Sequence, residues 1–223
     1  MRVSLLITRY PSWAIPFAFL SMALFRIPLW LNKNISFWKL MGSGKNGSFD
    51  LVPDLRQWAI LLVENSGPGI GNKELTSISF INNWIGFFKG KTTRYLLEPI
   101  EGHGFWDGRA VFGKLAKQTN YEGEIAVLTR ATIRFSKLKS FWKNVPLISK
   151  KMDRATGLIK SYGIGEVPFS KQATFSIWES KEAMKIFAYN MQEHKEVVRK
   201  THTENWYSEE MFVRFKVLDC TEM

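Results

Sequence analysis

Two kinds of apolar pattern alternate along the chain. Short runs rich in Val, Ile, Leu and Thr predict strands, and longer segments whose apolar residues recur every three or four positions predict helices. In the first half, strands are expected over 3–10, 36–44, 57–64 and 92–100, and helices over 12–31 and 72–88. In the second half, strands are expected over 124–135, 158–167, 172–179 and 209–218, and helices over 137–156 and 181–204. Both halves therefore have the order βαββαβ.

The two halves also share short strings, which indicates an internal duplication. Leu6-Ile7-Thr8-Arg9 resembles Val127-Leu128-Thr129-Arg130, at an offset of 121 residues. Gly42-Ser43-Gly44 resembles Gly163-Ile164-Gly165, also at 121. The string that begins at Gln57 resembles the one that begins at Gln172, at an offset of 115. The first copy is therefore expected to have a connection six residues longer before this strand.

The βαββαβ order is that of a ferredoxin-like unit. Two such units in one chain can close their sheets into an α/β barrel of the dimeric type, with the helices outside. We therefore expect an α+β fold with one integrated domain. Its first repeat covers 1–100, a connector rich in Gly, Lys and Asn covers 101–123, and the second repeat covers 124–223.

Composition and charge narrow the class of protein. Apolar residues make up 45% of the chain and aromatic residues 14%, which is typical of a folded core and excludes a disordered chain. Cys220 is the only cysteine, so a disulfide scaffold is excluded. The net charge of +11 suits an acidic protein partner, an anionic membrane or nucleic acid. Because the aromatic residues lie inside periodic apolar segments, a base-stacking surface for nucleic acid is not expected.

The most apolar segment of the sequence covers residues 11–31. It is interrupted by Pro16, Arg26 and Pro28, and it has no clear small-residue cleavage site. A spanning helix needs about 20 apolar residues, and a secretory signal needs such a cleavage site. We therefore expect a buried helix here, like its counterpart in the second half, and a peripheral membrane contact stays open.

One glycine-rich string matches a nucleotide-binding motif by letter only. Residues 42–47 read GxGxxG, but no helical pattern follows them and Pro53 comes soon after. The dinucleotide motif requires a helix that begins at the glycines and points at the pyrophosphate. We interpret these glycines as bulges or points of close backbone approach in strands.

Among three histidines, His194 has the most informative position. It lies at helical spacing on the same stripe as Met184, Phe187 and Met191. One interpretation is a core histidine that is hydrogen-bonded to a carbonyl, and the other is an axial ligand of a haem in a Met-lined and aromatic pocket. His202 has polar neighbours, and His103 is expected in a loop. No arrangement of nucleophile, histidine and carboxylate is evident.

Several long strings resemble the spheroidene monooxygenase family. The likeness is dense from Leu128 to Phe215, and looser before that. The strings that carry it are Leu128-Thr129-Arg130-Ala131-Thr132-Ile133, Phe141-Trp142, 163–168, 172–178, His194 with Val198-Arg199, 206–215, 37–44 and Trp106-Asp107-Gly108.

The resemblance implies a cytoplasmic haem b enzyme of carotenoid biosynthesis. Members would insert oxygen at C-2 of an acyclic carotenoid such as spheroidene, using O₂ and a reduced, acidic ferredoxin. His194 would be the proximal iron ligand, and Met184, Phe187 and Met191 would pack against the haem. Arg130 is the candidate catalytic residue as a distal donor, with a structural salt bridge as the alternative interpretation.

Other functions are compatible with the same sequence. A different haem reaction on this fold, such as aldoxime dehydration, would need no external electrons or O₂. A non-catalytic haem-binding or lipid-binding protein is a further alternative. The sequence leaves the exact carotenoid, the oligomeric state and the contact of helix 12–31 with a membrane open.

Overall fold

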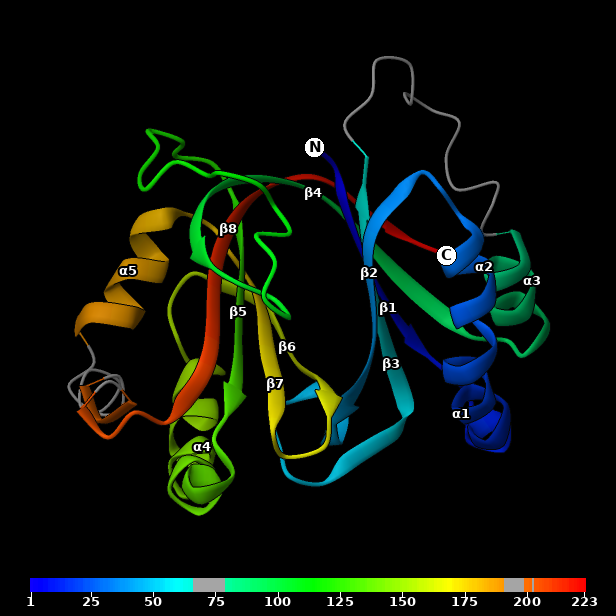
Figure 1. Ribbon diagram of the computed structural model, residues 1–223, viewed down its shortest axis with the longest axis horizontal. Coiled ribbons are helices and arrows are strands. Elements are labelled where there is room, and N and C mark those ends of the chain that lie inside the picture. Colours follow the sequence, from blue (N-terminus) through cyan, green and yellow to red (C-terminus); the bar gives the residue numbers. More distant parts are fainter. Residues whose placement is uncertain (66–78, 191–198, 202) are drawn as a thin grey trace.

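A computed structural model describes residues 1–65, 79–190, 199–201 and 203–223. In these residues the strands form one closed antiparallel barrel in the order β1-β3-β2-β6-β7-β5-β8-β4 (Figure 1). The strands are β1 (Val3–Arg9), β2 (Ile35–Gly44), β3 (Pro53–Glu64), β4 (Lys91–Gly104), β5 (Ile125–Ile133), β6 (Leu158–Val167), β7 (Lys171–Trp178) and β8 (Tyr207–Glu222). The helices are α1 (Ile15–Leu24), α2 (Arg26–Leu31), α3 (Ser79–Phe87), α4 (Leu138–Met152) and α5 (Lys181–Asn190).

The barrel consists of two ferredoxin-like halves. The first half has the strand order β4-β1-β3-β2, and the second has β8-β5-β7-β6. Pairing of β2 with β6 and of β4 with β8 closes the two sheets into one. The predicted fold class is therefore confirmed. The strand β4 continues to Gly104, so it takes the first residues of the range expected as the connector.

Strand register corrects one part of the predicted repeat. Thr8 pairs with Trp58 in the first half, and Thr129, which is its counterpart at 121, pairs with Thr174 in the second. Trp58 therefore corresponds to Thr174, at an offset of 116 rather than 115. The match between Gln57 and Gln172 is wrong by one residue. Gln57 pairs with Arg9, and its counterpart Ala173 pairs with Arg130, so the identity of the two glutamines is a coincidence. A shift by one residue would turn the side chains to the other face of the strand.

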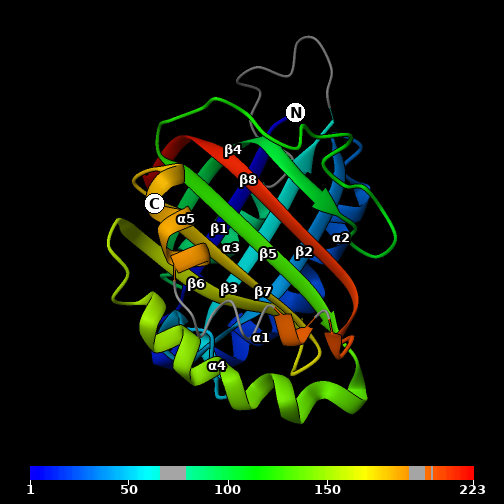
Figure 2. The same cartoon turned by 90° about the vertical axis from the view of Figure 1, so that its left-hand side faces the viewer.

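Alternate residues of each strand fill the barrel interior. On β5, Ala126 and Leu128 belong to the interior core, whereas Ile125 and Val127 pack on the outside with residues of α5. Figures 1 and 2 show α1, α2 and α3 on one side of the barrel and α4 and α5 on the other. Each helix layer thus covers the outer face of its own half.

In the literal GxGxxG string, Gly44 lies where backbone segments approach closely, and so does Gly163 of the second repeat. A Cβ on Gly44 would lie 2.3 Å from the carbonyl oxygen of Ser48, and a Cβ on Gly163 would lie 2.4 Å from that same oxygen. No side chain fits at such distances. A short 3₁₀ turn, Lys45–Gly47, follows rather than a helix. The interpretation as close backbone approach is confirmed for Gly44 and Gly163, whereas a Cβ on Gly42 would meet only the Trp58 side chain at 3.7 Å.

The apolar segment 12–31 is a helix that is buried on one face only. Ala18, Phe25 and Leu29 are buried against the first sheet. Only 28% of its most apolar window is buried, and by length and composition Ser12–Leu31 could cross a membrane. The expectation of a buried helix therefore holds for the inner face and is wrong for the outer one.

Candidate functional site

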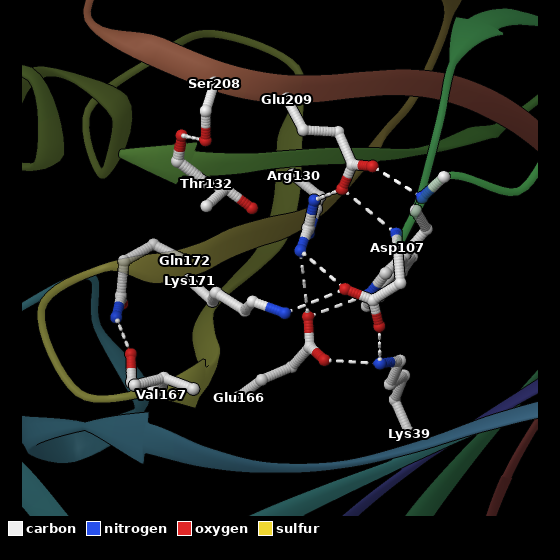
Figure 3. Close-up of polar contacts among 12 residues, drawn as sticks. Lys39, Asp107, Arg130, Thr132, Glu166, Val167, Lys171, Gln172, Ser208 and Glu209 are labelled. Carbon is white, nitrogen blue, oxygen red and sulfur yellow. Dashed lines mark hydrogen bonds and ion pairs between the residues drawn. The ribbon is translucent and has the colours of Figure 1, made fainter. Parts of the chain in front are cut away.

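Charged side chains from both halves meet at one end of the barrel. We call this group the mouth cluster, and Figure 3 shows its members pointing toward one another. Three cations face three carboxylates, so the opposite charges balance. The members are Lys39 on β2, Asp107 after β4, Arg130 on β5, Glu166 on β6, Lys171 on β7 and Glu209 on β8.

Arg130 lies at the centre of the mouth cluster with a side chain only 1% exposed. Like Leu128 two residues earlier on β5, it points into the barrel, and its Nη1 donates a hydrogen bond to Oε1 of Glu209. Its Nη2 also lies 3.4 Å from Oε1 of Glu166 and 3.5 Å from Oδ1 of Asp107. The structure therefore places Arg130 as a buried, ion-paired side chain that faces the barrel interior.

The Trp106-Asp107-Gly108 string closes this end of the barrel. Trp106 is fully buried, and its Nε1 donates to Oε1 of Glu166 at 2.7 Å. The backbone N–H groups of Asp107 and Gly108 donate to the Glu209 carboxylate at 3.0 and 2.7 Å. Asp107 adopts a left-handed φ of 50°, which turns its carboxylate back toward the cations of the cluster.

The surroundings of Asp107 and Glu209 favour their charged forms. Burial acts to raise the pKa of Asp107, but hydrogen bonds from Lys171 and Lys39 outweigh it and lower the pKa to about 2. Burial likewise acts to raise the pKa of Glu209, but the backbone N–H groups of Gly108 and Asp107 and the charge of Arg130 lower it. Both side chains are therefore carboxylates at neutral pH.

A cavity of about 550 Å³ lies beside the mouth cluster and shares Glu209 with it. His103 is one of its lining residues. This histidine lies on β4 opposite Phe212 of β8, with the ring centroids 6.0 Å apart. The expectation of a loop histidine is wrong, because β4 runs further than its apolar pattern. The remaining lining residues are Gly104, Phe105, Gly108, Thr201, Asn205, Tyr207, Ser208 and Glu210.

Met184 and Phe187 lie together on the outer face of the second sheet. Met184 is buried in a cluster with Val127 and Trp178, and the Phe187 ring lies 5.3 Å from that of Trp178. Phe212 packs against the same cluster. We call these side chains the outer apolar wall. Met191 and His194, the other two predicted site residues, lie outside the described residues.

Arg130 and the outer apolar wall lie on opposite faces of β5. The side chain of Val127 packs against α5 outside the barrel, whereas the side chain of Arg130 points inward, as that of Leu128 does. The structure therefore brings Met184 and Phe187 together but does not bring Arg130 to them. Arg130 reaches the cavity only through Glu209, which it contacts and which lines that cavity.

Curated proteins named spheroidene monooxygenase are similar to this chain in sequence. The one from Rhodobacter capsulatus is 31% identical over 206 residues, which cover 92% of this chain and 85% of that protein. The one from Cereibacter sphaeroides is 34% identical over 183 residues, which cover 82% of this chain and 56% of that protein. The one from Rubrivivax gelatinosus is 33% identical over 184 residues, 80% of this chain and 67% of that protein.

The chain belongs to the spheroidene monooxygenase family. The curated members of this family are named as monooxygenases, a class of oxidoreductases, which agrees with the resemblance. The chain spans little more than half the length of the Cereibacter sphaeroides relative. The search against family models matched none.

Solved structures with the same fold include aldoxime dehydratase. It covers 99% of this chain and 83% of its own, with a TM-score of 0.61 at 11% identity. An aldoxime dehydratase in complex with butyraldoxime gives a TM-score of 0.58, also at 11% identity, over 99% of this chain and 81% of its own. At such low identity the likeness establishes the fold alone.

Membership of the spheroidene monooxygenase family raises the question of whether the residues fit a haem. A haem needs an apolar wall, room beside it and an axial donor. The outer apolar wall is an apolar surface, the cavity that includes His103 offers room, and β8 contributes residues to both. Within the described ranges, no group of three or more His, Cys, Asp or Glu side chains could hold a metal ion. One axial histidine suffices for haem, and the predicted donor, His194, lies outside the described residues.

A second buried ion-pair group fastens α5 to the barrel. The Glu101 side chain on β4 is 1% exposed and accepts from Nζ of Lys181 at 2.7 Å and from the guanidinium of Arg214. It also accepts from the backbone N–H of Thr119 at 2.8 Å. Lys181 is the first residue of α5, so Glu101 joins the connector, the barrel and the helix that carries the outer apolar wall.

Proposed function

We propose that this chain is a haem-dependent monooxygenase that oxygenates an acyclic carotenoid of the spheroidene type at C-2. The observation that carries the proposal is the 31–34% identity to proteins named spheroidene monooxygenase over 80–92% of the chain. The co-substrates are O₂ and a reduced, acidic ferredoxin, whose negative charge suits the net charge of +11. The enzyme works in the cytoplasm, where it is peripheral on the inner membrane.

The reaction balances as two successive oxygenations. In each round C-2 loses one C–H bond and gains one C–OH bond, and the second oxygen atom of O₂ leaves as water with two electrons and two protons. Two hydroxyl groups on one carbon then lose water to give the ketone. Haem supplies the activation of O₂ when it is bound. His194 would be its iron ligand, and Met191 would pack against it together with Met184 and Phe187 of the outer apolar wall.

Arg130 acts in this proposal as a positioning residue. Its buried charge holds the Glu209 carboxylate, and Glu209 in turn holds the backbone of Asp107 and Gly108. Both Glu209 and Gly108 line the cavity. Arg130 therefore fixes one rim of the space in which the end group of the carotenoid is to be oriented.

The absorption spectrum of the full chain, with and without added haemin, tests the cofactor. We expect a Soret band that titrates to one haem per chain and that is lost or shifted in His194→Ala. His103→Ala is the matched control, because His103 belongs to the described cavity but is not the proposed ligand. An unchanged Soret band in His194→Ala would remove this ligand from the proposal.

Pigment analysis tests the reaction itself. Cells that accumulate spheroidene-type carotenoids and express this chain should gain carotenoids with an added carbonyl. If haem binds but the pigments stay unchanged, aldoximes should be offered without O₂ or electrons, because aldoxime dehydration needs neither. Haem binding without turnover of either substrate would instead identify a non-catalytic binding protein.

A further inference from the structure

Large apolar side chains gather on the outer surface of α1, α2 and α3. On α1, α2 and the turn before them, seven such side chains are between 38% and 78% exposed. On α3, Phe80 is 45% exposed and Phe87 is 78% exposed. We call this surface the N-terminal apolar face. Its members on the first segment are Trp13, Phe17, Phe19, Leu20, Ile27, Trp30 and Leu31.

Aromatic contacts join the helices of this face into one surface. The Phe17 ring stacks on Phe88 with centroids 4.3 Å apart, and Phe25 packs edge-on against Phe80 at 6.3 Å. Figure 1 shows α3 beside α1 and α2 on the same side of the barrel. Exposed apolar residues scattered singly need no explanation, but a contiguous patch marks an interaction surface.

The equivalent helix in the second half has a different outer surface. The helix α4 follows β5 as α1 follows β1, and it buries Phe141, Trp142 and Val145 against its own sheet. Its outer surface, however, carries exposed Lys139, Lys143 and Lys150. The same structural position can therefore be polar outside, so the apolar outer surface of α1 and α2 is not a requirement of the fold.

In the described residues, the exposed charged side chains on α1, α2 and α3 and directly after these helices are all positive. No Asp or Glu occurs in the sequence before Asp50, and none occurs from 79 to 97. These exposed cations are Arg26, Lys33, Lys89 and Lys91. An apolar surface with tryptophans at both ends of its helical segment and flanking cations suits the boundary between anionic headgroups and acyl chains.

We propose that the N-terminal apolar face docks this protein in the plane of a bilayer that contains anionic phospholipid. The segment lies on the membrane and does not cross it, because Phe25 and Leu29 of its inner face are 2% and 1% exposed against the barrel. A second copy of the chain is a poorer occupant, because a two-fold contact would bring two surfaces with the same positive charges together. The inference stands on exposure and charge; it rests on the proposed function only for the peripheral membrane location, to which it assigns a surface, and it does not depend on the proposed reaction.

Co-sedimentation of the full chain with vesicles tests this docking. We expect binding to vesicles of phosphatidylcholine with about a third phosphatidylglycerol, and weaker binding to phosphatidylcholine alone. The variant Trp13→Ser/Phe19→Ser/Trp30→Ser should bind at least about tenfold more weakly, since each side chain loses apolar burial. Phe135→Ser is the matched control: Phe135 is 89% exposed but lies in the turn before α4, and its loss should leave binding unchanged.

A second variant separates the charge from the apolar contact. Arg26→Glu/Lys33→Glu/Lys89→Glu keeps every apolar residue of the face and should reduce binding to the anionic vesicles only. Circular dichroism and light scattering of each variant report folding and oligomeric state. Equal binding of the serine variant and the unchanged chain would overturn the proposal. A lipid-independent dimer that the serine substitutions convert to a monomer would also overturn it, in favour of a self-association surface.

Discussion

The residues of the mouth cluster differ in how far their positions in the sequence indicate a site. Each of its strand residues lies two positions from an inward apolar residue, as Arg130 does from Leu128 and Glu209 from Met211. A charged residue at an inward-facing position of a predicted strand is therefore a signal that the sequence already contains. Arg130 was singled out, but its partners were not, because they come from different strands whose neighbours the sequence alone does not specify. His194 stays a prediction, because it lies outside the described residues.

At this scale we predict the effect of removing the central cation. Arg130→Met would leave the carboxylates of Glu209, Glu166 and Asp107 without their shared partner. Removing one partner from a buried ion pair costs about 3–5 kcal/mol of unfolding free energy. Urea denaturation measures it, and Arg134→Met, at an exposed neighbouring position, should stay within about 0.5 kcal/mol of the unchanged chain. Equal losses in the two variants would contradict the central role of Arg130.

Gly163 allows a similar test of backbone approach. A Cβ at this position would lie 2.4 Å from Cα of Phe49, so Gly163→Ala must displace backbone. We expect a loss of about 1–3 kcal/mol in unfolding free energy. Gly86→Ala is the control, because its Cβ would meet nothing within 4 Å on α3 and the substitution should stabilise that helix by about 1 kcal/mol. If thermal denaturation shows both variants to be equally stable, the close approach is not real.

At the scale of elements, the short runs rich in Val, Ile, Leu and Thr predicted every strand that the structure describes. The duplicated order βαββαβ then led to the correct barrel. The pattern erred for segment 12–31, because composition describes how apolar a helix is and not which surface covers it. It also ended β4 too early, because Gly102 and Gly104 interrupt the apolar run. Element ends and helix environments are set by tertiary contacts.

The attachment of α5 gives a prediction at this scale. Glu101→Ala would leave Lys181 and Arg214 without their buried carboxylate, and would free the backbone N–H of Thr119. We expect the chain to lose about 3–5 kcal/mol of unfolding free energy. Hydrogen exchange should accelerate most in the connector and α5. Glu98→Ala, which removes an exposed carboxylate from the same strand, should leave exchange there unchanged; matching behaviour of the two variants would argue against the attachment.

At the scale of the whole molecule, the mouth cluster ties the two halves together. Lys39 comes from the first half, and its ammonium contacts Glu166 of the second half at 2.6 Å. Asp107 contacts Lys39 and also Lys171 of the second half. The halves are thus joined by charge as well as by strand pairing, and neither half can present this arrangement alone.

Low pH should weaken the ion pairs of the mouth cluster that connect the two halves. The pKa of Asp107 is lowered to about 2 in the folded chain, and that of Glu209 is also lowered. Their contribution to stability is therefore complete above about pH 4, the usual carboxyl pKa, and is lost as the pH falls toward 2. Melting temperatures measured from pH 5 to pH 2 should fall less steeply in Asp107→Asn. An identical slope in that variant would show that Asp107 does not contribute.

The filled interior of the barrel has a consequence for selectivity. Its inward side chains, such as Leu61, Phe175 and Phe215, are fully or almost fully buried and pack against one another, so a rod-shaped polyene does not thread through them. Under the proposed function, only the terminus of the carotenoid would be recognised, and the conjugated remainder would trail outside the protein. Such an enzyme discriminates by the tip of its substrate, and acyclic pigments of different overall length but identical ends would be accepted alike.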